Sequence, residues 1–239
     1  MPFQTVFKRY ETKYLLTEEQ YRRVRQAMEP YMVLDLYGRS VIRSIYLDTS
    51  NYRLIRHSLE GPAYKEKLRV RSYGPADPDS TVFVELKKKY KNVVYKRRIA
   101  LPEQEAADWL LGKRHCQPHT QITAEVDYFL QYYQCLQPAV LVMCGREAFC
   151  TREPSDFRVT FDDTILFRQE DLSLKSGVYG SSLLPEGTVL MEVKCSGGMP
   201  LWMARVLSKE GIYKTSFSKY GTAYRTRIFP QLHPEVCHG

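Results

Sequence analysis

Charged and apolar residues alternate in several short segments of this chain. Lys65–Arg71 reads Lys-Glu-Lys-Leu-Arg-Val-Arg, and the segments Glu85–Lys89, Lys96–Arg98, Arg158–Asp162 and Glu192–Lys194 also place polar or ionised groups at every second position. Residues two apart lie on the same face of a β-strand. The pattern therefore predicts strands with one ionised face and, in most of them, one apolar face.

The spacing of apolar and turn residues predicts mixed α and β structure in a single domain, residues 1–239. Strands are expected at residues 6–15, 40–48, 63–73, 80–90, 92–101, 139–149, 156–162 and 188–195. Helices are expected between Thr17 and Pro30, between Pro102 and Gly112, and at 120–136 and 200–210; the first opens with a capping-box pattern, Thr17-Glu-Glu-Gln20. Residues 74–80 indicate a hairpin turn and 172–187 a polar loop, and neither is typical of a domain linker.

These elements favour an α+β fold, in which about eight mostly antiparallel strands form a closed β-barrel with helices packed outside. The apolar faces, represented by Val84, Leu86, Phe161 and Met191, would contact the helices, and the ionised faces would point inward. The alternative is that the ionised faces point to water, which is the common arrangement for an isolated charged pair on a strand.

The sign of the charges favours the inward arrangement. The cations expected to point inward are Lys13, Lys67, Arg69, Arg71, Lys87, Lys96, Arg98, Arg146, Arg158, Lys194 and Lys219, and the anions are Glu11, Glu85, Asp162 and Glu192. A face exposed to water would mix the signs more evenly, and a barrel cannot hold this excess of cations without counter-anions. We therefore predict a site for a polyanion, whose glutamates balance charge or hold a divalent cation.

The composition agrees with an anionic partner and excludes several other classes of protein. The formal net charge is +8. No run of about 18 apolar residues predicts a transmembrane helix, and neither a secretory signal nor a Cys-x-x-Cys pair occurs, so a cytoplasmic protein with reduced cysteines is expected. Glycine-rich nucleotide motifs and hydrolase motifs are absent, and the histidines do not predict a catalytic triad or a metal site.

Nine short motifs, spread in order along nearly the whole chain, resemble those of a known family. They are Glu11-Thr-Lys13-Tyr14, Ser44-Ile-Tyr-Leu-Asp48-Thr49, Lys67-Leu-Arg69-Val-Arg71, Glu85-Leu-Lys87, Lys96-Arg-Arg98, Arg146-Glu-Ala-Phe149, Arg158-Val-Thr-Phe-Asp162, Met191-Glu192-Val-Lys194 and Ser216-Phe-Ser218-Lys219-Tyr220. The set resembles the vacuolar transporter chaperone (VTC) catalytic domain, a polyphosphate polymerase of the triphosphate tunnel metalloenzyme (CYTH-like) superfamily.

The resemblance implies a barrel whose basic lumen binds ATP and polyphosphate, and a reaction that transfers the γ-phosphoryl group of ATP to a growing polyphosphate chain. It implies Mn²⁺ or Mg²⁺ on the triphosphate, with Glu192 as the first candidate ligand and Glu85 and Glu11 as further ones. The implied catalytic residues are Lys219, Arg69, Arg71, Arg146 and Arg158. The implied substrate-binding residues are Lys13, Lys67, Lys87, Lys96, Arg98, Lys194 and Ser218. Positioning and charge stabilisation suffice for phosphoryl transfer, so no covalent nucleophile is needed.

The chain departs from the family pattern in two respects. Cys144 stands where the family often has a tyrosine, two residues before the arginine aligned with Arg146, which removes one hydroxyl contact. The chain also lacks the inositol-phosphate-sensing and membrane segments of eukaryotic transporter complexes. It therefore resembles a free-standing catalytic module without direct membrane insertion, and no membrane-associated partner is specified.

Two other functions fit the same sequence. An inorganic or nucleoside triphosphatase would keep the fold and pass the phosphoryl group to water, although the long basic tract favours a chain over a single triphosphate. A non-catalytic module would bind polyphosphate or RNA. Nucleic acid is not the expected partner, because most aromatic residues, such as Phe83, Phe161 and Trp202, are assigned to packing faces; Tyr73 and Tyr90 fit either face.

Overall fold

Ten strands form one sheet in the computed structural model of the chain, which describes residues 10–91 and 93–234. The strands are β1 (Tyr10–Thr17), β2 (Met32–Asp48), β3 (Tyr64–Tyr73), β4 (Thr81–Tyr90), β5 (Val93–Pro102), β6 (Gln137–Thr151), β7 (Arg158–Arg168), β8 (Ser181–Ser182), β9 (Thr188–Cys195) and β10 (Lys214–Thr215). The helices are α1 (Glu18–Met28), α2 (Arg53–Leu59), α3 (Glu103–Leu110), α4 (Gln121–Tyr133), α5 (Leu201–Lys209), α6 (Lys219–Ala223), the π-helix η1 (Tyr224–Ile228) and α7 (Phe229–Leu232).

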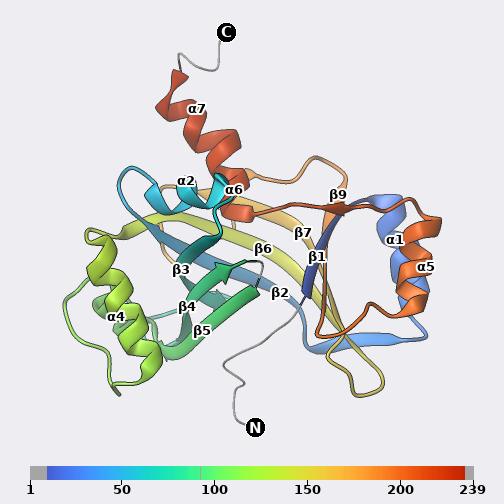
Figure 1. The fold of residues 1–239 in the computed structure, drawn as a ribbon, viewed down its shortest axis with the longest axis horizontal. Helices are drawn as coiled ribbons and strands as arrows, with labels where there is room; N and C mark the ends of the chain where they lie inside the picture. The colour runs from blue at the N-terminus through green and yellow to red at the C-terminus, as the bar shows by residue number, and fades with distance from the viewer. Residues whose placement is uncertain (1–9, 92, 235–239) are drawn as a thin grey trace.

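The strands pair antiparallel in the order β10-β1-β9-β7-β6-β2-β3-β4-β5, and β8 pairs with β7. The sheet curls, with β3, β4 and β5 on one side, β1, β7 and β9 on the other, and the long strands β2 and β6 passing between them (Figure 1). Within the described residues no backbone pairing joins β5 to β1 or β10. The sheet is therefore not closed by hydrogen bonds, which corrects the closed barrel of about eight strands expected from the sequence.

The two wings of the curled sheet, which β2 and β6 join through backbone pairing, also meet across the inner face through side chains. The short strand β10 already pairs with β1 opposite Lys13 and Tyr14. Glu11 on β1 lies 3.9 Å from Nζ of Lys87 on β4, although β1 and β4 are not neighbours in the sheet. Backbone pairing requires strands about 4.8 Å apart, a spacing that leaves no room for two long ionised side chains end to end.

Helices cover the outer face of the sheet, as the alternation of apolar residues predicts. One buried cluster joins the apolar face of β4 to α3 and α4 and includes Val82, Val84, Leu86, Trp109, Val126 and Phe129. A second joins β7 and β9 to α1 and α5 and includes Phe161, Met191, Val193, Val24, Met28, Met203 and Leu207. Phe83 does not belong to this outer face. The β4 register places it, half-buried, on the inner face with Glu85, which corrects the packing role that the sequence indicates.

The segment boundaries agree with the sequence where local signals are strong. Gln20 N donates to Oγ1 of Thr17 at 3.2 Å and Thr17 N donates to the Gln20 side chain at 3.1 Å, so the predicted capping box opens α1. The expected polar loop at 172–187 instead contains β8 and the buried Leu174. Helix α2 and the first half of β2 were not expected. The expected strand at 6–15 lies partly outside the described residues.

The described residues contain neither a membrane-spanning helix nor a disulfide. None of their helices combines the length and apolar character that a membrane crossing requires. Their five cysteines form no disulfide, and Cys237 lies outside the described part.

Candidate functional site

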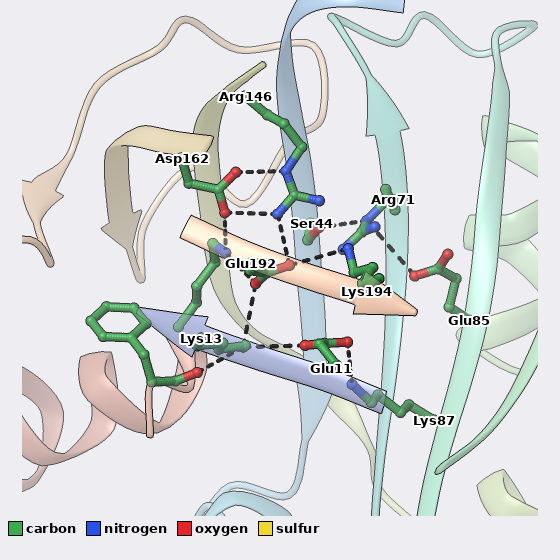
Figure 2. A network of polar contacts seen from close by, with 12 residues as sticks. Glu11, Lys13, Ser44, Arg71, Glu85, Lys87, Arg146, Asp162, Glu192 and Lys194 are labelled. Atoms are coloured by element: carbon green, nitrogen blue, oxygen red, sulfur yellow. Dashed lines mark hydrogen bonds and ion pairs between the residues drawn. The ribbon is translucent and has the colours of Figure 1, made fainter. Parts of the chain in front are cut away.

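Ionised side chains from seven strands and one helix form a network of ion pairs in two groups on the inner face. We call it the inner network. Its cations are Lys13, Arg69, Arg71, Lys87, Lys96, Arg98, Arg146, Lys194 and Lys219, and its carboxylates are Glu11, Glu85, Asp162 and Glu192. The charged strand faces predicted from the sequence therefore do point inward. The carboxylates divide the network into two centres, one around Glu192 and one around Glu85 (Figure 2).

The first centre surrounds Glu192 on β9, whose side chain is 7% exposed. The carboxylate has four cations within reach: Lys194 at 3.2 Å, Lys13 at 3.3 Å, and Lys219 and Arg146 each at 3.4 Å. Asp162 on β7 is fully buried and accepts hydrogen bonds from Arg146, at 2.7 Å, and from Lys219. Burial alone would raise the pKa of Glu192, but the surrounding cations hold that pKa well below its usual range. Lys219 and Arg146 likewise lower the pKa of Asp162 against the effect of its burial, so both carboxylates are ionised at neutral pH.

The second centre surrounds Glu85 on β4, which is inaccessible to solvent. Its partners are Lys96 at 2.6 Å, Arg69 at 2.7 Å, Arg71 at 3.7 Å, and Arg98 in direct contact. Burial opposes ionisation, yet these four cations hold the pKa of Glu85 well below its usual range. A single carboxylate is thus the shared ion-pair partner of four cations, so this centre carries a surplus of positive charge.

Glu11 extends the Glu192 centre to Lys87 of β4, which shares the inner face of that strand with Glu85. Its carboxylate lies 3.5 Å from Nζ of Lys13 and 3.9 Å from Nζ of Lys87, between the two lysines in Figure 2. Burial raises the pKa of Glu11, but Lys87, Lys194 and Lys13 bring it down to about 2. The cations therefore form one tract across both wings of the sheet.

Two lysines of the inner face have strongly lowered pKa values. Burial, with nearby Lys87, Lys65 and Lys13, lowers the pKa of Lys67 to about 8; its ammonium donates to Oγ of Ser218 at 3.1 Å. Burial and the neighbouring Arg98 and Arg69 lower the pKa of Lys96 to about 7 despite its contact with Glu85. Both are less basic than an ordinary lysine, first because burial disfavours the ammonium form and then because neighbouring cations repel it. A bound polyanion would balance this positive charge.

We expect the affinity for a nucleoside triphosphate to fall as the pH rises from about 7 to 9. Lys67 and Lys96 lose their protons in this range when no ligand is bound, whereas bound phosphate raises both pKa values and favours the charged forms. Binding near pH 8 should then take up about one proton per ligand. Calorimetry in buffers of different ionisation enthalpy measures this uptake. Lys67→Arg and Lys96→Arg are matched controls, because arginine does not titrate there, and uptake that persists in the double variant would contradict the assignment.

The donor set is compatible with a divalent metal that is shared with substrate. Among residues 10–91 and 93–234 no group of three or more His, Cys, Asp or Glu side chains is arranged to hold a metal ion alone. Mg²⁺ in phosphate-binding sites usually takes one or two carboxylates and completes its shell with phosphate oxygens and water. Glu11 and Glu192, which share Lys13, form such a pair. Glu85 fits less well, because four cations already occupy its oxygens.

The remaining residues that the sequence singled out lie in different surroundings. Ser218 caps α6, where its Oγ accepts from Gly221 N at 3.2 Å and from Lys67. Arg158 lies opposite Lys194 in the β7–β9 register but is exposed, and its catalytic role stays a prediction. Cys144 is buried on β6 in an apolar cluster that also contains Tyr220.

Three residues of β2 support the site, although none of them was among the predicted site residues. Ser44 accepts a hydrogen bond from Arg71 at 3.3 Å, and Tyr46 accepts one from Arg69 at 2.9 Å. Buried Asp48 accepts from the Tyr220 hydroxyl at 2.9 Å and from two backbone N–H groups of α2, so it ties α2 to the segment that carries Lys219. Their spacing of two residues within the Ser44–Thr49 motif was a signal for one shared strand face.

Solved structures show which class of fold this is. A candidate adenylate cyclase from Bacillus halodurans superposes with a TM-score of 0.58 at 14% identity, over 94% of this chain and 100% of the other. A Hippeastrum protein, a candidate adenylyl cyclase described as having a dominant triphosphatase activity, gives a TM-score of 0.53 at 12% identity, over 92% of this chain and 96% of the other. At these identities the likeness concerns the fold alone, which is that of the CYTH-like triphosphate tunnel proteins.

The family follows from the sequence. The model of the family described as VTC domain matches residues 8–228, which is nearly the whole chain, and the chain belongs to this family. No curated protein sequence matches it at a significant level.

Proposed function

We propose that this protein is a metal-dependent polyphosphate polymerase, which transfers the γ-phosphoryl group of ATP to the end of a polyphosphate chain. The observation that carries the proposal is that the inner network has two cationic centres, and not one, which lie next to each other where Glu11 meets Lys87 beside Glu85 on β4. A single triphosphate needs one such centre. A donor triphosphate and an acceptor chain together need a longer tract of cations.

The residues of the Glu192 centre suit the reacting phosphoryl group. Burial opposes the charge on Lys219, but Asp162 and Glu192 raise its pKa above the ordinary lysine value. Lys219 therefore remains an ammonium ion and stabilises charge on the γ-phosphoryl oxygens, and it does not act as a proton donor. Arg146, which is fixed by Asp162, presents its guanidinium to the same region.

The reaction balances without a general base. A terminal oxygen of the acceptor forms a bond to the γ-phosphorus, the bond from that phosphorus to the β,γ-bridging oxygen breaks, and ADP leaves with the electron pair. The acceptor oxygen is already largely ionised at neutral pH, since the second pKa of a phosphate monoester is about 6. Glu192 and Glu11 would hold a Mn²⁺ or Mg²⁺ ion, which neutralises phosphate charge when bound.

Product analysis tests the proposal directly. Purified protein is incubated with ATP and Mn²⁺, the products are resolved on a gel stained for polyphosphate, and ADP and free phosphate are measured in parallel. A polyphosphate ladder with ADP but little free phosphate supports the polymerase. Free phosphate without a ladder indicates a triphosphatase on the same fold, and the absence of ATP turnover with any divalent metal would contradict both enzymatic functions.

We expect Glu192→Gln to raise the Mn²⁺ concentration for half-maximal activity by about 10- to 100-fold. The substitution replaces the ionised carboxylate of Glu192 by a neutral amide. Glu192 contributes both to the cation centre and to the proposed metal site. Activity is measured across a Mn²⁺ titration for this variant and for Glu186→Gln, which changes an exposed glutamate. An unchanged Mn²⁺ requirement in the Glu192 variant would exclude Glu192 as a metal ligand.

A further inference from the structure

Three aromatic side chains lie together where β3 ends and β4 begins. We call Tyr37, Tyr73 and Phe83 the aromatic cluster. The rings of Tyr37 and Tyr73 are stacked, with centroids 6.3 Å apart and planes inclined by 18°, and Phe83 meets Tyr73 edge-on at 5.7 Å. Tyr37 is 77% exposed and Tyr73 46% exposed. The cluster therefore offers aromatic surface to a partner and is not part of the core.

The aromatic cluster is continuous with the Glu85 centre. Arg98 pairs with Glu85, donates to the Tyr73 hydroxyl at 3.0 Å and lies 4.5 Å from the centroid of the Phe83 ring. Tyr73 shares the inner face of β3 with Arg71 and lies two residues beyond it, about 6.6 Å along the strand. The distance from these cations to the aromatic rings is therefore one that a single sugar unit can span.

A protrusion of β2 holds Tyr37 in place. The pairing of β2 with β6 is interrupted between Leu34 and Arg39. Within the interruption the Asp35 carboxylate accepts from Tyr37 N at 2.9 Å, and Gly38 has a φ of +52°, a conformation that favours glycine. The local backbone therefore directs Tyr37 out of the regular strand and onto Tyr73.

We infer that the aromatic cluster is a nucleobase subsite, which stacks the base of the nucleoside triphosphate whose phosphates bind the inner network. The inference rests on the proposed function and adds to it the part of the site that recognises the donor. Exposed rings beside phosphate-binding cations are the combination by which proteins hold nucleotides without reading base edges. A polyphosphate chain has no ring to stack, so the cluster distinguishes the nucleotide donor from the phosphate acceptor.

The test compares two ligands and two substitutions at one position. Dissociation constants are measured by calorimetry with Mn²⁺ for the β,γ-imido analogue of ATP and for inorganic triphosphate. Tyr73→Leu should weaken binding of the ATP analogue about five- to 100-fold and leave the affinity for inorganic triphosphate unchanged. Tyr73→Phe keeps the ring and loses the hydroxyl bonded to Arg98, so it should bind the ATP analogue like the unmodified protein. Tyr128→Leu, an exposed tyrosine of α4 on the outer side, is the matched control.

The outcomes separate this inference from the proposed function. Equal weakening of both ligands in Tyr73→Leu would overturn the subsite, because Tyr73 would then act only by holding Arg98. Unchanged binding of both ligands would overturn it as well. Selective loss of the ATP analogue supports the subsite even if no polyphosphate ladder forms, so a failed polymerase assay does not decide this test. If the unmodified protein binds neither ligand, both proposals are wrong.

Discussion

We expect Lys219→Ala to lower kcat for phosphoryl transfer by about 100- to 1,000-fold, the loss typical of removing one preorganised group that stabilises transition-state charge. Lys219 contacts both Asp162 and Glu192, and these carboxylates keep it protonated at the centre of the inner network. The charge is therefore in place before substrate binds. Rates of ADP release under saturating ATP and Mn²⁺ give kcat, and their dependence on ATP gives KM.

Two variants control for indirect effects of the Lys219 substitution. Lys209→Ala removes an exposed lysine of α5 and should leave both constants unchanged. Lys219→Arg keeps the positive charge next to Asp162 and should restore part of the rate. A Lys219→Ala variant with a normal kcat and a raised KM would show that Lys219 binds substrate and transition state equally, which is contrary to the role proposed for it.

We expect Glu85→Gln to lower the free energy of unfolding by about 3–5 kcal/mol, the loss found when one partner of a buried ion pair is removed. Glutamine has nearly the shape of glutamate but no charge, so Arg69, Arg71, Lys96 and Arg98 would repel one another without a common counter-ion. For a domain of this size the corresponding fall in Tm is about 6–20 °C. Urea unfolding and thermal melting measure the two quantities.

Ligand rescue makes the Glu85 prediction specific to charge. Inorganic triphosphate should raise the Tm of Glu85→Gln more than that of the unmodified protein, because phosphate then supplies the missing negative charge. Glu186→Gln, at an exposed site, should change neither stability nor the response to triphosphate. A Glu85→Gln protein as stable as its parent would show that the four cations do not need this carboxylate.

Much of the inner network could be predicted because a strand has a period of two. In β3 the run from Lys67 to Arg71 leaves only one assignment of faces once Leu68 and Val70 must be buried. The same reasoning placed Glu192 and Lys194 of β9 beside one another. The reasoning failed for Phe83. An aromatic residue is ordinarily assigned to a packing face, but Phe83 lies on the same face of β4 as Glu85.

Which charges meet across the site could not be predicted, because pairing between distant strands is not encoded in local periodicity. Nothing near Glu11 in the sequence indicates Lys87, and the two meet only because the sheet curls without closing. The same holds for Tyr220 and Asp48, whose hydrogen bond positions Lys219, and for Tyr37, which an irregularity of β2 carries onto Tyr73.

The sequence by itself determined most of the strands, their ionised and apolar faces and the excess of cations, since these follow from residue types at fixed spacings along an extended chain. Only the tertiary structure decided how those charges are shared. Glu85 pairs with four cations, Glu192 shares two of its four with Asp162, and Glu11 pairs with Lys13 and Lys87. The physical reason is that local structure fixes the face of the strand on which a charged side chain lies, but it does not fix the side chain with which that charge pairs. The partner depends on how strands far apart in the chain approach one another.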